Sequence, residues 1–257
     1  MHSRPQSFHM NQSIFSAHES LGKWYNPILL NPATLFHRAQ RPTTMQRVLD
    51  VLDVLTPDDY AVYVSRFYRE GMEKFAPDWC YLDIITVLCA AAELIRPQNY
   101  LEIGVRRGRS LAVVLSRSPA TNCFGFDMWK ENYAGMKNPG SAFVEEELRG
   151  IGHTGTLEFI DGNSHQTLKV FLKKFPGLLF DLITVDGDHS DKGAYEDLRD
   201  VLPRVAPGGT VVFDDISHPE HPNLANVWAK AIKDSKLPFK EARYADLGYG
   251  IAVAVRQ

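Results

Sequence analysis

The sequence lacks several features that would point to other classes of protein. It has only three cysteines among 257 residues, at spacings that fit no common disulfide framework or zinc pattern, so we expect buried, reduced thiols. No apolar run approaches the roughly 20 residues that a membrane helix needs. Residues 1–13 also lack the apolar stretch of a secretory signal. We therefore expect a cytoplasmic protein with no membrane partner.

The sequence also lacks an excess of charge of one sign. Its formal net charge is −3, so no long-range positive field favours nucleic acid as a partner. The basic cluster of Arg106, Arg107 and Arg109 is local, and we interpret it as a solvated turn. Hydrophobic residues make up 44% and charged residues 23%, which is typical of a globular domain with an ordinary core.

The N-terminal part of the chain predicts an appendage. Residues 1–42 are rich in Pro, Asn, Ser and His with scattered aromatics, which favours an irregular arm and a contact with a second copy of the chain. Helical periodicity begins near Met45, and Thr56-Pro57 predicts the cap and first residue of a second helix. A third helix is expected over Tyr81–Leu94. We divide the chain into an N-terminal arm and helical cap, 1–76, and a main domain, 77–257.

From Asn99 short apolar strands alternate with helical stretches, which predicts right-handed crossovers and a parallel sheet. The last two strands are joined by Asp246–Gly248, which is short enough for an antiparallel hairpin. We expect an α/β fold: a Rossmann-like, seven-stranded, mostly parallel sheet with an antiparallel C-terminal strand and an N-terminal helical extension. This arrangement resembles the class I S-adenosylmethionine-dependent methyltransferase fold. The expected strands are Tyr100–Ile103, Cys123–Phe126, Leu157–Ile160, Leu179–Val185, Thr210–Phe213, Lys240–Ala245 and Tyr249–Val255.

The strongest local signal is a glycine turn after the first of these strands. Glycine is needed where a ligand approaches the backbone too closely for a Cβ. The pattern Glu-x-Gly-x-x-x-Gly differs from the Gly-x-Gly-x-x-Gly of dinucleotide folds, and an acid at this place would repel a pyrophosphate but suits an ammonium group. We therefore expect the methionine part of S-adenosylmethionine here. The predicted contacts are Glu102, Gly104, Val105, Gly108 and Ser110.

The next two strands also end in acids. Asp127 lies about 20 residues past the glycine turn, where a carboxylate can accept both ribose hydroxyls, and Met128 follows it. Asp161, Gly162 and Asn163 are expected beside the adenine. The alternative for all of these positions is a role in turns or helix caps.

Three aspartates follow the fourth and fifth strands. Asp186, Asp214 and Asp215 would converge at one edge of the sheet, where carboxylates repel each other unless they are protonated or bind a cation. Oxygen ligands favour Mg²⁺, with Mn²⁺ or Ca²⁺ possible. His189, three residues after Asp186, is suited to act as a general base on an acceptor hydroxyl. Asp186 is also expected to contact the cofactor, and the alternative is again a turn and a helix cap.

The run Asp186-Gly187-Asp188-His189-Ser190, with Asp214-Asp215 downstream, resembles the metal-dependent O-methyltransferases of bacterial natural-product pathways, including those that act on macrolide sugars. The resemblance to catechol O-methyltransferases is more distant, because there a lysine takes the place of His189 and the pair is Asp-Asn. The resemblance covers residues 97–257. It implies that the three aspartates hold the metal, that His189 is the base, and that the acceptor is a hydroxyl of a small molecule.

Other functions remain open at this stage. A nicotinamide-dependent oxidoreductase would need the missing glycine pattern. A metal-independent methyltransferase of the same fold would act on nitrogen or on a protein side chain, and a non-catalytic binding module would keep only the fold. The loop with His218 and His221 lies either at the rim of the substrate pocket or in solvent, which is the commoner place for a loop histidine. Trp129, Tyr133 and Met136 are expected to form a lid, to pack in the core or to contact another subunit.

Overall fold

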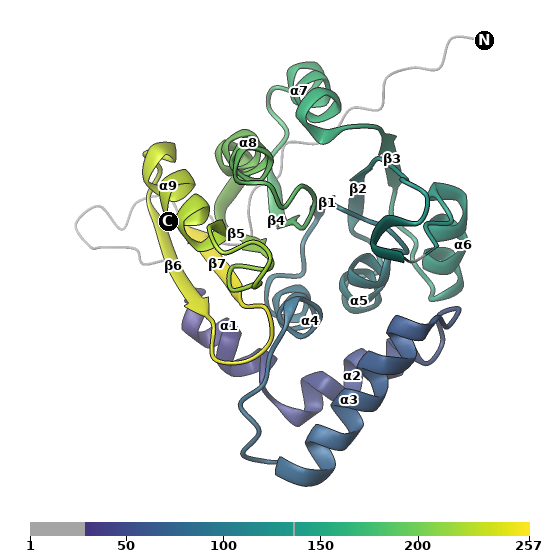
Figure 1. The fold of residues 1–257 in the computed structure, drawn as a ribbon. Coiled ribbons are helices and arrows are strands. Elements are labelled where there is room, and N and C mark those ends of the chain that lie inside the picture. Colours follow the sequence, from purple (N-terminus) through teal and green to yellow (C-terminus); the bar gives the residue numbers. More distant parts are fainter. Residues whose placement is uncertain (1–28, 136) are drawn as a thin grey trace.

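The computed structural model describes residues 29–135 and 137–257. They form a central sheet with a layer of helices on each face (Figure 1). The sheet has the expected seven strands, in the order β3-β2-β1-β4-β5-β7-β6. β7 pairs antiparallel with both β5 and β6, whereas β1 to β5 pair in parallel. This is the class I methyltransferase arrangement. The strands are β1 Asn99–Ile103, β2 Asn122–Asp127, β3 Leu157–Asp161, β4 Phe180–Val185, β5 Val205–Phe213, β6 Phe239–Tyr244 and β7 Ile251–Arg256.

Helices cover both faces of the sheet (Figure 1). One face packs on α7, α8 and α9 through a cluster that includes Phe171, Leu198 and Trp228. The other face packs on α4, α5 and α6. Because both faces are covered, β1 and β4 are buried along their whole length. The helices of these layers are α4 Ile84–Ile95, α5 Arg109–Arg117, α6 Ser141–Gly150, α7 Ser164–Lys174, α8 Asp191–Val201 and α9 Leu224–Ser235.

Two element boundaries differ from the sequence expectation. β5 begins at Val205, not Thr210, because Val205 pairs with Phe180 ahead of a register shift that absorbs Gly208 and Gly209. The sequence predicts a helix over Gly193–Val205, but α8 ends at Val201, and a 3₁₀ turn, η2 (Leu202–Arg204), follows it. Pro203 lacks the N–H that would continue the α-helical ladder.

The N-terminal helices are α1 Pro32–Ala39, α2 Pro42–Leu52 and α3 Asp59–Phe75. The expected irregular arm is wrong for α1, where Asn31 accepts a hydrogen bond from the backbone N–H of Ala33 and Pro32 begins the helix. The expected cap at Thr56 is also wrong, because Asp58 caps α3. Residues 1–28, which include the rest of the arm, lie outside the described residues.

The very apolar helix α4 explains why this N-terminal layer is needed. Nearly every α4 side chain is buried, and α1, α2 and α4 share one core cluster with α5 and the sheet. The division at residue 76 stays a prediction. Cys89 and Cys123 are buried as expected, but Cys80 is exposed. No helix within the described residues has the length and apolar character of a membrane span.

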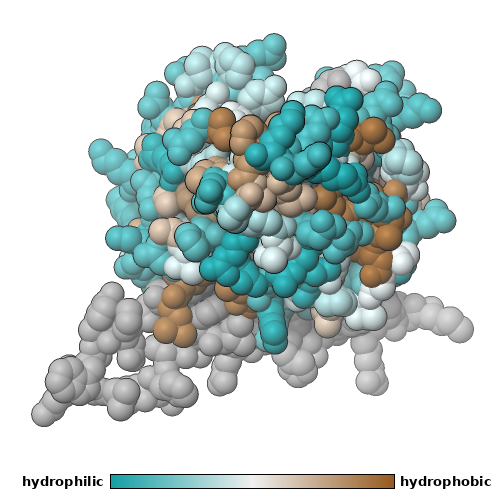
Figure 2. Space-filling view, turned by 90° about the horizontal axis from the view of Figure 1, so that it is seen from below, coloured by the Kyte–Doolittle hydropathy of each residue, from teal (hydrophilic) through white to brown (hydrophobic). Residues whose placement is uncertain are grey.

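The face of the molecule that lies at the bottom of Figure 1 is mainly hydrophilic, and its apolar side chains form separate small patches (Figure 2). Several exposed apolar side chains belong to α3, among them Val62, Tyr63 and Phe75. Scattered exposure of this kind is ordinary for a globular surface, so the expected homo-oligomer stays a prediction.

Candidate active site

The glycine turn after β1 is shaped by a very close backbone contact. Gly104 has φ +92°, and a Cβ there would lie 1.8 Å from the carbonyl oxygen of Asp186. Gly108 has φ +72° and caps α5, where a Cβ would lie 2.5 Å from Val144 Cγ1. Both glycines are therefore required by the packing of the protein itself, and they bring the turn against the end of β4.

The carboxylate of Glu102 is fully buried beside this turn. It accepts hydrogen bonds from the hydroxyl groups of Tyr100 and Ser110, the latter at 2.7 Å. Burial raises the pKa of Glu102 to about 8, although the two hydroxyl donors oppose the shift. Its contact with an ammonium group, and those of Ser110 and of the buried Val105, stay predictions.

Asp127, at the end of β2, is hydrogen-bonded to the backbone of the glycine turn. One of its oxygens accepts from the backbone N–H of Arg106 at 2.7 Å, and the other accepts from the backbone N–H of Trp129 at 2.6 Å. Each carboxylate oxygen has a further lone pair, so these bonds orient the group and leave it able to accept from a ribose. Met128 beside it is 61% exposed.

The end of β3 shows the turn and capping role, while its contacts with adenine stay predictions. Asp161 accepts from the indole N–H of Trp129 at 2.5 Å, which places that ring over the β2–β3 edge. The backbone N–H of Gly162 donates to the Asp127 carbonyl, and Asn163 caps α7 through a bond from the His165 N–H. The capping alternative is confirmed for Asn163. Of the expected lid, Met136 lies outside the described residues.

The ends of β4 and β5 carry the group with the clearest chemistry. His189 lies between two carboxylates, with its Nε2 3.2 Å from Asp186 Oδ1 and its Nδ1 3.6 Å from Asp215 Oδ2. The exposed fractions of the His189 and Asp215 side chains are 16% and 14%, so the imidazole is largely shielded from water. Asp186, His189 and Asp215 each offer a ligand atom, and these atoms lie within 4.8 Å of one another.

Asp214, the third residue of the expected metal set, lies outside the described group around His189, and its Oδ1 accepts from the backbone N–H of Asp215 at 2.9 Å. Its role as a metal ligand stays a prediction. Burial, with the charges of Asp186 and Asp215, raises the pKa of Asp214 well above its usual range. Burial and the charge of Asp186 raise the pKa of Asp215 to about 6. The hydrogen bond to Asp186 raises the pKa of His189 despite its burial. The cluster therefore has more negative charge than its surroundings stabilise.

Tyr60 of the N-terminal layer lies within electrostatic range of these carboxylates, which the sequence did not reveal. Partial burial and the carboxylates of Asp83, Asp214 and Asp186 raise the pKa of Tyr60 on α3. In the sequence, Tyr60 belongs to a helical pattern with Tyr63, Val64 and Phe67 that indicates ordinary packing. No local feature of the sequence therefore identified Tyr60 as a neighbour of the carboxylates.

The basic cluster is also different from its expected form. Arg107 and Arg109 are only 11% and 13% exposed, and both pair with Asp58 at the start of α3. Its interpretation as a solvated turn is wrong, because these ion pairs fasten α3 beside the glycine turn.

Comparison with known proteins identifies the domain. A family model described as a methyltransferase domain matches residues 101–216, the stretch from β1 to the end of the Asp214-Asp215 pair. The matched stretch is a little under half of the chain. The match agrees with the expectation of a methyltransferase enzyme in this part of the chain. No curated protein matches the sequence.

Solved methyltransferase structures share the fold of this chain at low identity. The apo structure of CalS11, a TDP-rhamnose 3'-O-methyltransferase of calicheamicin biosynthesis, is 20% identical with a TM-score of 0.51, over 83% of this chain and 93% of that one. TomG from Streptomyces achromogenes, an O-methyltransferase of tomaymycin synthesis solved with SAM, is 18% identical with a TM-score of 0.54, over 79% and 91%. The SAH-bound methyltransferase PaMTH1 of Podospora anserina is 14% identical with a TM-score of 0.52, over 79% and 98%.

Proposed function

We propose that this methyltransferase transfers the methyl group of S-adenosylmethionine to a hydroxyl oxygen of a small molecule, with His189 as general base and a divalent cation at the neighbouring carboxylates. The observation that carries the proposal is the position of the His189 imidazole between Asp186 and Asp215, with Asp186 itself in backbone contact with the glycine turn. A base and a cofactor turn thus meet at one sheet edge, where α/β folds bind their ligands.

The chemistry asks little of the protein beyond alignment and one proton transfer. The acceptor O–H gives its proton to a lone pair of neutral His189, while the oxygen attacks the sulfonium methyl group in line. A C–O bond forms and the S–CH₃ bond breaks, so the leaving group is the neutral thioether S-adenosylhomocysteine. The ring N–H of His189 donates to one carboxylate, which fixes the tautomer and leaves the other nitrogen for the proton.

The residues fit a divalent cation of the oxygen-preferring kind. Asp186 and Asp215 supply two carboxylates beside His189, and the raised pKa of Asp215 shows that burial and Asp186 disfavour its ionised form in the absence of a counter-charge. Mg²⁺ or Mn²⁺ supplies positive charge that stabilises the alkoxide character of the acceptor. Asp214, one residue before Asp215, is proposed to support the backbone of that ligand, since it accepts the Asp215 N–H.

The donor is proposed to lie along the edge from β4 to β3. Asp127 is oriented by two backbone N–H groups and is available to the ribose hydroxyls. Asp161 and the amide of Asn163 follow at the next strand end, where adenine is expected, while the Gly162 N–H already bonds to the Asp127 carbonyl. Ser110, at the start of α5, and the turn Gly104–Gly108 are proposed to hold the methionine part.

The test is a methyl-transfer assay with labelled S-adenosylmethionine on a panel of hydroxylated acceptors that includes a TDP-deoxysugar and a catechol. We expect transfer to one class of hydroxyl, loss of transfer on chelation with EDTA, and recovery with Mg²⁺ or Mn²⁺. His189→Ala is expected to lower kcat about 10²- to 10⁴-fold while the donor still binds. His37→Asn, on α1, is the matched control. If His189→Ala leaves kcat unchanged, the general-base role is refuted.

One observation favours a second candidate, metal-independent methyl transfer to nitrogen or to a protein side chain. The raised pKa of His189 means that an imidazolium can itself neutralise Asp186 and Asp215 without a cation. A protonated His189 has no lone pair for a hydroxyl proton, so this state does not support base-assisted O-methylation. Activity that survives EDTA and Asp215→Asn would select this second function.

A further inference from the structure

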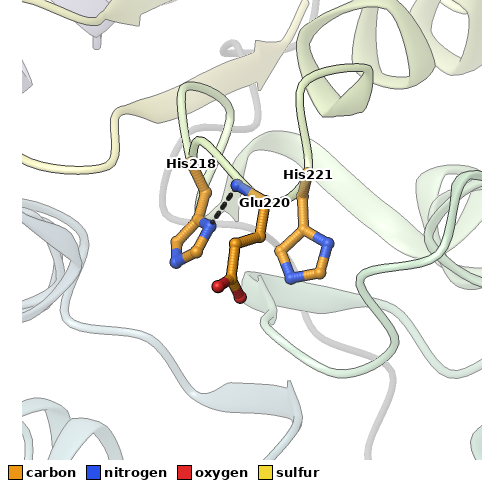
Figure 3. A group of neighbouring side chains, drawn as sticks. All are labelled: His218, Glu220 and His221. Atoms are coloured by element: carbon orange, nitrogen blue, oxygen red, sulfur yellow. Dashed lines mark hydrogen bonds between the residues drawn. The ribbon is translucent and has the colours of Figure 1, made fainter.

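A second group of potential ligands lies in the loop between β5 and α9. His218, Glu220 and His221 project from the same side of this loop (Figure 3), and each offers a ligand atom within 4.8 Å of the others. None of the three belongs to the group around His189. The methyltransferase chemistry proposed above assigns them no role.

The loop holds this arrangement by its own backbone. The N–H of His218 donates to the Asp215 carbonyl at 3.1 Å, and the N–H of His221 donates to the His218 carbonyl at 3.0 Å. The Ser217 N–H donates to the Tyr249 carbonyl at 2.6 Å, which fastens the loop to the segment before β7. Because these bonds fix the turns, the three side chains are brought together before any ligand arrives, which lowers the entropy lost on binding.

The rings form a continuous series that begins at the proposed base. The centroid of the His221 ring is 5.0 Å from that of His189 and 5.0 Å from that of His218. The His218 ring in turn packs on Tyr249 with centroids 4.1 Å apart. The group of His218, Glu220 and His221 therefore lies directly beside the proposed base, because the His221 ring neighbours the His189 ring.

The donor atoms decide which ion the group favours. Two imidazoles and one carboxylate suit borderline transition metals such as Zn²⁺, Co²⁺ and Ni²⁺, whereas Mg²⁺ prefers oxygen ligands alone. Three protein ligands leave an open coordination position, which is the arrangement of catalytic and substrate-binding zinc sites. This set thus differs in preference from the carboxylate-rich group at Asp186 and Asp215.

One contact in the loop opposes binding. The backbone N–H of Glu220 donates to His218 Nδ1 at 3.1 Å, so neutral His218 carries its proton on Nε2. A cation at Nδ1 displaces this N–H, and a cation at Nε2 requires the proton to move to Nδ1. Either way this hydrogen bond is given up, which predicts an affinity below that of a fully prepared site.

We propose that His218, Glu220 and His221 form a second cation site that takes a borderline transition-metal ion beside the methyl-transfer centre. The proposal is independent of which acceptor is methylated.

The experiment uses Co²⁺ as the probe, since its visible spectrum reports nitrogen coordination. The metal-free full-length protein is titrated with Co²⁺ in excess Mg²⁺, which occupies the oxygen-preferring site. We expect one Co²⁺ to bind with a visible absorption band. His218→Asn and His221→Asn are each expected to weaken binding roughly tenfold or more, because even the loss of a partner that only orients a ligand costs 10- to 100-fold. Circular dichroism and Tm show whether these variants fold.

Two controls locate the ion. Asp186→Asn is expected to leave the Co²⁺ affinity unchanged, and loss of binding in this variant would place the ion at the carboxylate group and overturn the proposal. The sequence also has His2, His9 and His18. Binding that persists unchanged in the folded double variant His218→Asn/His221→Asn would belong to such other histidines and would equally overturn it, as would the absence of Co²⁺ binding in excess Mg²⁺.

Discussion

Replacing Gly104 by alanine tests the contact on which the site is built. The structure places the new Cβ 1.8 Å from the Asp186 carbonyl oxygen, at a φ of +92°. The unfavourable φ costs about 1–3 kcal/mol. Forcing backbone atoms apart adds roughly 1–3 kcal/mol more, as in other overpacked cores. Because the displaced atoms belong to Asp186, we expect donor binding to be lost along with stability.

Gly140 offers a matched control. Its φ is +90°, almost the same as that of Gly104, but no atom lies within 4 Å of an added Cβ. Gly140→Ala therefore pays the conformational cost without the collision. A difference of about 2 kcal/mol between the variants corresponds to roughly 4–8 °C in Tm for a chain of this size.

The assay combines thermal unfolding of both variants with calorimetric titration of S-adenosylmethionine. We expect Gly104→Ala to have the lower Tm and to lose donor binding, while Gly140→Ala binds the donor as the wild type does. Equal losses of Tm in the two variants would show that the β1 turn does not press on Asp186, and the geometry of the site would have to be abandoned.

Three further predictions follow from the buried charges. The folded-state pKa of Glu102, about 8, exceeds the value of 4.5 in the unfolded chain, so the wild type is expected to lose stability relative to Glu102→Gln as pH rises from 4.5 through 8. By linkage, the loss of unfolding free energy is at most about 5 kcal/mol. Urea unfolding of both proteins at pH 5, 7 and 9 measures this loss. A stability difference between them that does not change with pH would contradict the burial of this carboxyl. Asp215→Asn is expected to weaken Mn²⁺ binding at least tenfold, and Asp214→Asn much less, in a titration followed by electron paramagnetic resonance; equal losses would restore Asp214 as a ligand. Asp58→Ala removes the cap of α3 and the partner of Arg109, so we expect a loss of about 2–3 kcal/mol in urea unfolding, and an unchanged midpoint would refute the anchoring of α3.

The local sequence determined the order and type of the elements in the main domain. Apolar strands separated by helical stretches fix a parallel sheet, because a short-range pattern decides which segments bury both faces. The acids at strand ends were equally visible, since strand polarity alone places Asp127, Asp186 and Asp215 at one edge. These features depend on residues close together in the sequence, so they can be predicted from the sequence alone.

Only the tertiary structure decided which contacts each side chain makes at that edge of the sheet. The sequence treats Asp214 and Asp215 alike, but the turn after β5 directs one to a backbone N–H and the other to His189. The approach of Tyr60 to the carboxylates depends on how α3 packs, which the ion pairs of Asp58 set over a distance of about fifty residues in the chain. Such contacts join segments far apart in sequence, and their energies depend on burial that no local pattern records.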